Sequence, residues 1–200
     1  MWVRDAGSVM SMSPATILVV DNDPAVADAF RSYLRDRYRV RVAYDGEVGL
    51  RRFDEDVEVV LLDRRMPNVS GDEVLEHIRS RDRTCQVAMV TAVDPDFDIV
   101  DMEFDDYVQK PVSEEELLDT VEGLLQRQTY GEKLQAFYTA AKKFATLQTE
   151  KTEAQLSDND EYARLKARLV RLREEVDEAI QELNEWEGFD IAVNTFSADS

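Results

Sequence analysis

Residues 17–23 read ILVVDND and residues 59–67 read VVLLDRRMP, and in both stretches four apolar residues end abruptly on an aspartate. A continuous apolar run of this length is typical of a strand that is buried on both faces of a parallel sheet. A similar run lies at 87–90 and a shorter one at 107–108. Residues 38–42 instead alternate polar and apolar side chains, which predicts a half-exposed strand at an edge of the sheet.

Amphipathic stretches separate these runs and read as helices. They cover residues 24–36, 46–54, 70–80 and 113–127, with a shorter candidate at 96–103. Strands that alternate with helices predict a parallel sheet with helices on both faces. We therefore expect residues 16–129 to form a doubly wound α/β domain with a five-stranded parallel sheet, preceded by a disordered extension at 1–15.

The composition of the chain narrows the classes of function. Its 200 residues include 43 acidic and 24 basic side chains, which give a net charge of −19. An acidic surface repels phosphate backbones and so argues against nonspecific binding to nucleic acid. The single Cys and the single His argue against a disulfide, a zinc site and a histidine-based catalytic relay. No apolar run of about 18 residues and no secretory signal are present, so we expect a cytoplasmic protein with no membrane contact.

Strand patterns stop after residue 129. Residues 131–156 read as one helix with a loose apolar seam. A break follows at 157–160, where Ser157 is the expected cap of a second helix. The second helix spaces its apolar residues at alternating steps of three and four, which is the heptad pattern of a coiled coil. The first seam consists of Leu134, Phe137, Ala141 and Phe144, and the second of Tyr162, Leu165, Leu169, Leu172, Val176, Ala179, Leu183 and Trp186.

A seam this narrow must be buried against another helix. The nearest candidate is the preceding helix, folded back as an antiparallel hairpin. Because the first seam has only half as many positions, we expect residues 176–186 to contact a second copy of the chain, as a homodimer, or a helical partner protein. Residues 189–200 show no periodicity and are expected to form a loose tail.

Reactive polar groups gather where the predicted strands end, at one edge of the sheet. Asp21-Asn22-Asp23 follows the first strand, Asp63 the third, Thr91 the fourth and Lys110 the fifth. Asp63 is a carboxylate nucleophile that can form an acyl phosphate. The acidic triplet offers oxygen ligands for Mg²⁺, while Lys110 and Thr91 offer a positive charge and a hydroxyl to phosphoryl oxygens.

Four segments resemble the receiver domain of two-component response regulators and follow that family's order. They are ILVVDND at 17–23, VVLLDRRMP at 59–67, AMVTA at 88–92 and DDYVQKPV at 105–112. The resemblance implies the flavodoxin-like strand order 2-1-3-4-5 and phosphorylation of Asp63 by a sensor histidine kinase. It also implies that Thr91, Lys110 and Tyr107 respond to the phosphoryl group. The implied Mg²⁺ ligands are Asp21, Asp63, the position of Asn22 and the backbone carbonyl of Arg65.

One position departs from the receiver pattern. The family usually has two consecutive carboxylates where this chain has Asp21-Asn22. Asn22 keeps a carbonyl oxygen but lacks the second negative charge, which predicts weaker binding of Mg²⁺. Asp23 is a further candidate ligand that could compensate.

Residues 130–188 resemble the HalX domain, an output module that follows receivers in haloarchaea. The resemblance rests on KLQAFYTAAKKFATLQTEK at 133–151 and EYARLKARLVRLREEVDEAIQEL at 161–183. It implies a helical architecture and a halophilic source, which also suits the excess of acids and the presence of only six lysines. No helix-turn-helix or basic recognition helix is evident in this part of the sequence.

These features favour a response regulator, not an enzyme, that signals through a helical protein-interaction output. A DNA-binding transcriptional regulator with the same receiver is the first alternative, and a receiver disabled by Asn22 is another. A phosphatase of the haloacid dehalogenase type also begins with an apolar strand and Asp-x-Asp, as at 21–23. Its later acid pair would have to be Asp105-Asp106, which precedes Lys110, and Asp63 would have no role. Phosphate on Asp21 would indicate the phosphatase, and phosphate on Asp63 the receiver.

Overall fold

The computed structural model describes residues 14–81 and 84–184, and the chain divides into two compact units after Leu117. The predicted extension up to residue 13, Trp186 and the predicted tail at 189–200 lie outside the described residues, as does the side chain of Leu183. None of the described helices is long and apolar enough to cross a membrane.

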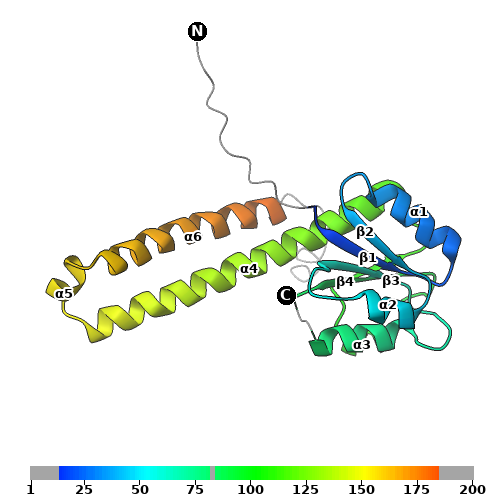
Figure 1. Cartoon of the computed structure of the whole chain (residues 1–200), viewed down its shortest axis with the longest axis horizontal. Coiled ribbons are helices and arrows are strands. Elements are labelled where there is room, and N and C mark those ends of the chain that lie inside the picture. Colours follow the sequence, from blue (N-terminus) through cyan, green and yellow to red (C-terminus); the bar gives the residue numbers. More distant parts are fainter. Residues whose placement is uncertain (1–13, 82–83, 185–200) are drawn as a thin grey trace, which may run out of the picture. The chain divides into compact units, whose positions relative to one another are not determined.

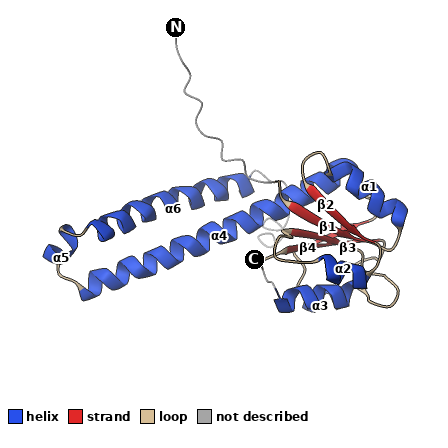
Figure 2. Ribbon diagram, in the orientation of Figure 1, coloured by secondary structure: helices blue, strands red, loops and turns tan. Residues whose placement is uncertain are grey.

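The first unit is built on a five-stranded parallel sheet in the order β2-β1-β3-β4-β5. This confirms the predicted order and the edge position of the second strand. Figure 2 labels the first four of these strands. Burial follows the sequence pattern, since the apolar strands β1 and β3 are buried along their whole length and β2 only at its end. The strands are β1 (Thr16–Val20), β2 (Arg39–Ala43), β3 (Val59–Leu62), β4 (Gln86–Thr91) and β5 (Asp106–Gln109).

Helices cover both faces of this sheet, with α1 (Pro24–Leu34) on one face and α2 (Gly46–Arg52) and α3 (Gly71–Arg81) on the other (Figure 1). Aspartates at the strand ends begin the first two helices: Asp23 accepts a hydrogen bond from the Ala25 amide at 2.9 Å, and Asp45 from the Val48 amide at 2.7 Å. Such caps satisfy amides that the first helical turn leaves unpaired. A buried apolar core lies between the sheet and α2 and α3; its members include Leu18, Val20, Val60, Leu62, Val74 and Ile78.

The connection from β4 to β5 contains less helix than the sequence predicts. Instead of a helix over 96–103, it holds one short 3₁₀ helix, η1 (Phe97–Asp101), capped by Asp96. The segment 93–106 contains seven acids and no basic residue. Phe97 is 91% exposed and Val100 is 75% exposed. A segment that buries so few apolar side chains gains little from packing, which accounts for the short helix.

The helices predicted at 113–127 and 131–156 are in fact one helix, α4 (Glu114–Glu150), so the expected interruption near residue 130 is wrong. Gly131 lies within this helix, and a Cβ added there would meet nothing within 4 Å. A single helical glycine costs only about 1 kcal/mol relative to alanine. Good helix formers on both sides outweigh that cost, and the helix continues.

The connection at the end of the hairpin also differs from the prediction. A short helix, α5 (Glu153–Ser157), precedes α6 (Asp160–Asn184). Ser157 therefore ends α5 and does not cap α6. Asn159 is the cap, since its side chain accepts a hydrogen bond from the Tyr162 amide at 2.8 Å. Both residue types cap helices well, so the sequence alone did not distinguish them.

The second unit contains the predicted antiparallel hairpin, in which α6 runs back beside α4 (Figure 1). Phe144 of α4 stacks on Tyr162 of α6, with ring centroids 5.2 Å apart and planes at 9°. The predicted seam residues of α6 up to Ala179 are the ones withdrawn from solvent: Tyr162, Leu165 and Leu169 are half-buried, and Leu172, Val176 and Ala179 are buried.

The structure corrects the expectation of a partner chain for Val176 and Ala179, whereas the side chain of Leu183 and Trp186 lie outside the described residues. Val176 is 8% exposed and Ala179 is 3% exposed within a single chain. The expectation assumed that the preceding helix begins near residue 131. Because α4 begins at Glu114, the hairpin has a longer helix available to cover this part of α6.

Candidate functional site

Asp21 is the first residue after β1 and is held there by the backbone. Its amide donates to the Ala43 carbonyl at 3.0 Å, and its own carboxylate accepts from the Asp23 amide at 2.9 Å. The residue is 2% exposed. Burial raises the pKa of the Asp21 carboxyl group above its usual value, because the charged form is poorly solvated, and the hydrogen bond from Lys110 acts in the opposite direction.

Asp63 follows β3 and lies in the same site as Asp21. Its amide donates to the Val20 carbonyl at 2.8 Å, which ties the ends of the two central strands together. The Lys110 Nζ lies 3.1 Å from Asp63 Oδ1 and 2.6 Å from Asp21 Oδ2. The side chains of Asp63, Lys110 and Asp21 are 9%, 16% and 3% exposed, respectively. One ammonium group thus bridges two carboxylates in a largely dehydrated setting.

The donors at this site suit a hard divalent cation. Two carboxylates supply charged oxygen ligands, and Asn22, which is exposed beside them, carries a carbonyl oxygen. Among the described residues no third acidic, His or Cys side chain joins them as a metal cluster. The carboxylate of Asp23 is engaged at the start of α1. Mg²⁺ usually keeps several waters and needs only one or two protein carboxylates, so the set is sufficient.

Thr91 and Tyr107 both reach the backbone of the same residue, Val93. The Thr91 hydroxyl accepts from the Val93 amide at 3.3 Å, and the Tyr107 hydroxyl donates to the Val93 carbonyl at 2.7 Å. Thr91 is buried, while Tyr107 is half-buried against Phe104, with ring centroids 5.6 Å apart. A change at either hydroxyl would therefore alter the start of the β4–η1 connection.

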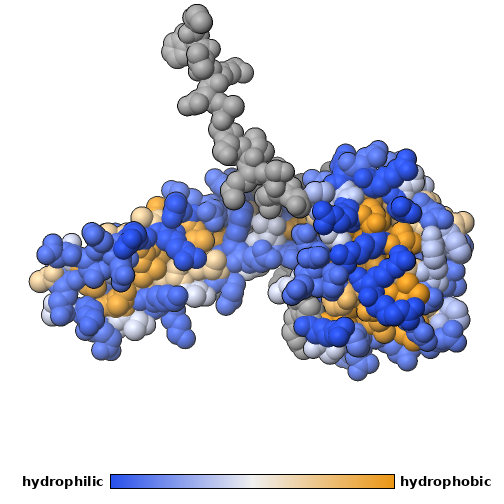
Figure 3. Space-filling view, in the orientation of Figure 1, coloured by the Kyte–Doolittle hydropathy of each residue, from blue (hydrophilic) through white to orange (hydrophobic). Residues whose placement is uncertain are grey.

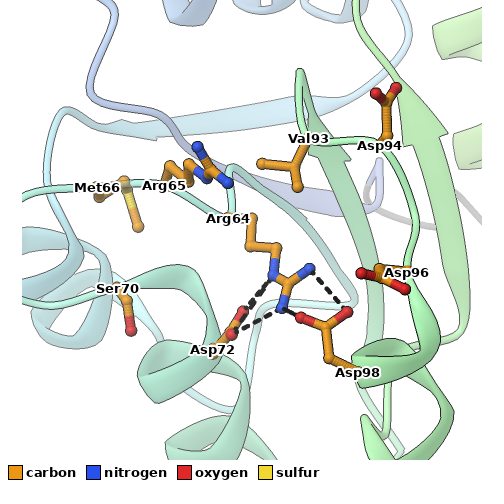
Figure 4. A pocket seen from close by; sticks show the side chains of 9 residues that line it. All are labelled: Arg64, Arg65, Met66, Ser70, Asp72, Val93, Asp94, Asp96 and Asp98. Atoms are coloured by element: carbon orange, nitrogen blue, oxygen red, sulfur yellow. Dashed lines mark hydrogen bonds and ion pairs between the residues drawn. The ribbon is translucent and has the colours of Figure 1, made fainter.

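Arg64 was not singled out from the sequence, although it directly follows Asp63. Its guanidinium turns toward Asp72 at the start of α3 and Asp98 in η1, and it forms ion pairs with both (Figure 4). The guanidinium of Arg64 lowers the pKa of the Asp98 carboxyl group. These groups line an open pocket of about 580 Å³ between the β3–α3 loop and η1. Arg64 thereby connects the residue next to Asp63 with the β4–β5 connection.

Gly71 is a second position that sequence reasoning missed. A Cβ placed there would lie 2.3 Å from the Asp63 carbonyl oxygen and 2.8 Å from the Arg64 Cα. The Gly71 amide also donates to the Arg64 carbonyl at 2.9 Å. This close approach fixes the backbone that presents Asp63. The sequence offers only a glycine at the start of a predicted helix, a place where glycine also occurs without any such contact.

Arg65, the predicted source of a backbone carbonyl ligand, is exposed two residues beyond Asp63. Its role, like that of Asn22, remains a prediction. Asp105 of the acid pair has a structural role, since it accepts from Arg79 at 2.5 Å and from the Val87 amide at 2.7 Å.

Comparison with known families divides the chain in two. Residues 17–122 match the model of the response regulator receiver domain, and residues 126–192 match the model of the HalX domain. A protein of Haloferax volcanii named "Putative transcriptional regulator" is 46% identical over 166 residues, which are 82% of this chain and 28% of that protein. The transcriptional regulatory protein TrcR of Mycobacterium tuberculosis is 35% identical over 126 residues, 60% of this chain and 49% of TrcR. The chain thus spans half or less of the length of these relatives.

Solved structures resemble the first unit. A CheY-like receiver domain from Methanospirillum hungatei aligns with a TM-score of 0.55 at 27% identity, covering 58% of this chain and 97% of that one. The BeF3-activated DrrB receiver domain aligns with a TM-score of 0.53 at 30% identity, covering 56% of this chain and 97% of its own.

Proposed function

This chain belongs to the family of response regulator receiver domains, continued by a HalX domain, and we propose that it accepts a phosphoryl group on Asp63 from a sensor histidine kinase. The observation that carries the proposal is the triad of Asp63, Asp21 and Lys110, joined at 2.6 and 3.1 Å at the carboxyl ends of the strands. The same arrangement follows the family pattern of acid, phosphoacceptor and lysine.

The reaction replaces the N–P bond of a phosphohistidine with an O–P bond to Asp63. An Asp63 carboxylate oxygen attacks the phosphorus of a phosphohistidine, the N–P bond breaks, and the imidazole leaves with the electron pair. Asp21, Asp63 and Asn22 are the residues that would hold Mg²⁺, which would supply positive charge to the phosphoryl oxygens. Lys110 already contacts the attacked carboxylate and can turn its ammonium to the new phosphoryl oxygens. The hydroxyl groups of Thr91 and Tyr107, which contact the backbone of Val93, then transmit the effect of phosphorylation to the β4–η1 connection.

The test is labelling of the purified chain by a small phosphodonor in molar salt. Wild type is expected to take up base-labile phosphate only with Mg²⁺, and Asp63→Asn is expected to take up none. Asn22→Asp restores a carboxylate and should lower the Mg²⁺ concentration required for half-maximal labelling. Full labelling of Asp63→Asn would refute the assignment.

For the output we propose protein–protein contact through the hairpin. A transcriptional role is the second candidate, because two relatives are named as transcriptional regulators. The −19 charge disfavours direct contact with DNA. Binding of a labelled DNA duplex at physiological salt by the phosphorylated chain, but not by Asp63→Asn, would favour the second candidate.

A further inference from the structure

The closed end of the hairpin carries an open groove of about 790 Å³, formed by the end of α4, by α5 and by the start of α6. Its lining includes the half-buried side chains of Leu147, Leu156 and Leu165. Figure 3 shows apolar surface exposed along the hairpin between hydrophilic side chains. A groove with several apolar side chains together differs from the single exposed apolar residues that are scattered over ordinary protein surfaces.

The rim of this groove is basic in an otherwise acidic chain. Lys142, Lys143 and Lys151 line it, and they are three of the six lysines in the sequence. All three are exposed, and none forms an ion pair within the part of the chain that the structure describes. Glu161 is the single acid among the lining residues. The groove therefore offers unpaired positive charge around an apolar floor.

The first unit presents the complementary surface. Phe97 and Val100 of η1 are the two most exposed large apolar side chains among the described residues, at 91% and 75%. They lie within the segment 93–106, which has seven acids and no base. Exposed aromatic residues surrounded by charge are typical anchors of protein interfaces.

We propose that the η1 segment of one copy of the chain docks in the hairpin groove of a second copy. Phe97 and Val100 enter the apolar floor, and the surrounding acids face the three lysines. A nucleic acid fits less well, because an apolar floor gives phosphates no contact and the chain as a whole repels them. If each copy docks its η1 segment in the groove of the other, a closed dimer forms. If the contact is not reciprocal, each copy binds a further one and open-ended oligomers form.

Two variants of the whole 200-residue chain separate the two sides of the contact. The groove variant carries Lys142→Glu, Lys143→Glu and Lys151→Glu, and the segment variant carries Phe97→Ser and Val100→Ser. All five positions are exposed, so both variants should keep the circular dichroism spectrum of wild type. The matched controls are Lys166→Glu and Val170→Ser, which are exposed on α6 and do not line the groove.

The measurement is sedimentation velocity over a concentration series, repeated at low and at molar salt. We expect wild type and both controls to associate, and each variant alone to associate at least tenfold more weakly. Mixing the two variants should restore heterodimers, since the mixture contains one intact groove and one intact segment. A wild type that stays monomeric, variants that associate normally, or a mixture that stays dissociated would each overturn the proposal. So would a groove variant that loses affinity for a labelled DNA duplex while its self-association is unchanged.

Discussion

Replacing Lys110 with Met should reveal how strongly the site formed by Asp21 and Asp63 depends on one positive charge. The Lys110 ammonium is the partner of both buried carboxylates, at 2.6 Å from Asp21 and 3.1 Å from Asp63. Lys110→Met keeps much of the side-chain volume but leaves two largely buried carboxylates facing each other. The removal of one member of a buried ion pair is strongly destabilising, because the remaining charge is dehydrated and unpaired.

The size of the effect follows from the two contacts. Hydrogen bonds to charged groups contribute about 1.5–3 kcal/mol each, so two such bonds give an upper range of about 3–6 kcal/mol. The Lys110 side chain is 16% exposed, and water can replace part of its contribution. We therefore expect the free energy of unfolding to fall by about 3 kcal/mol, toward the low end of the range for broken buried pairs.

The assay is urea unfolding followed by circular dichroism, once with EDTA and once with excess Mg²⁺. The deficit of Lys110→Met should be largest in EDTA and smaller with Mg²⁺. A cation bound only by the folded state stabilises it, by about 2.7 kcal/mol at 100 times its dissociation constant. Lys110→Met should gain more from Mg²⁺ than wild type does, because no ammonium group competes with the cation for its two carboxylates. The exposed Lys166→Met is the control and should change stability by less than about 0.5 kcal/mol. Equal stability of wild type and Lys110→Met in EDTA would refute the electrostatic reasoning.

Three further predictions concern other parts of the chain. Gly71→Ala should slow phosphorylation and lower stability by at least about 2 kcal/mol, because its Cβ would press on the backbone of Asp63, the proposed phosphoacceptor. Gly131→Ala lies in open space and should add about 0.5–1 kcal/mol to the stability of its helix; thermal unfolding of the two variants checks both expectations. Leu172→Asp, which buries a charge in the hairpin, should lower helicity at 222 nm, while Val170→Asp, 54% exposed, should not; equal spectra would contradict the packing. Asp98→Asn should increase hydrogen exchange in η1 near neutral pH, because it weakens the ion pair with Arg64. Arg64 lowers the pKa of Asp98, so the stabilisation by this ion pair should be fully present above the ordinary value of 3.8 and be lost as the pH falls through the lowered pKa. The difference in exchange between variant and wild type should follow the same pH dependence.

The sheet could be predicted because its strands carry unambiguous patterns. The apolar runs at 17–20 and 59–62 became buried central strands, and residues 39–43 became the edge strand. Parallel strands place their carboxyl ends at one edge, so the meeting of Asp21, Asp63 and Lys110 followed from order along the chain alone. The observed contacts among these three residues agree with that reasoning.

Other features could not be predicted, because they depend on small differences in free energy or on contacts between distant residues. The continuity of α4 through Gly131 is set by a cost of about 1 kcal/mol against flanking helix formers. The choice between Ser157 and Asn159 as cap rests on two residues of similar capping strength. The ion pair of Arg64 with Asp98 joins residues 34 positions apart, and no local sequence pattern predicts it.

Asp63 is the residue proposed to carry phosphate, and mapping the modified residue tests this assignment most directly. The chain is incubated with a small phosphodonor and Mg²⁺, the acyl phosphate is trapped by chemical reduction, and the peptides are sequenced by mass spectrometry. We predict that the reduced residue is Asp63, that EDTA prevents the modification, and that the peptide containing Asp21 is unmodified. Modification of Asp21 with Asp63 intact would contradict the account and indicate phosphatase-like chemistry instead.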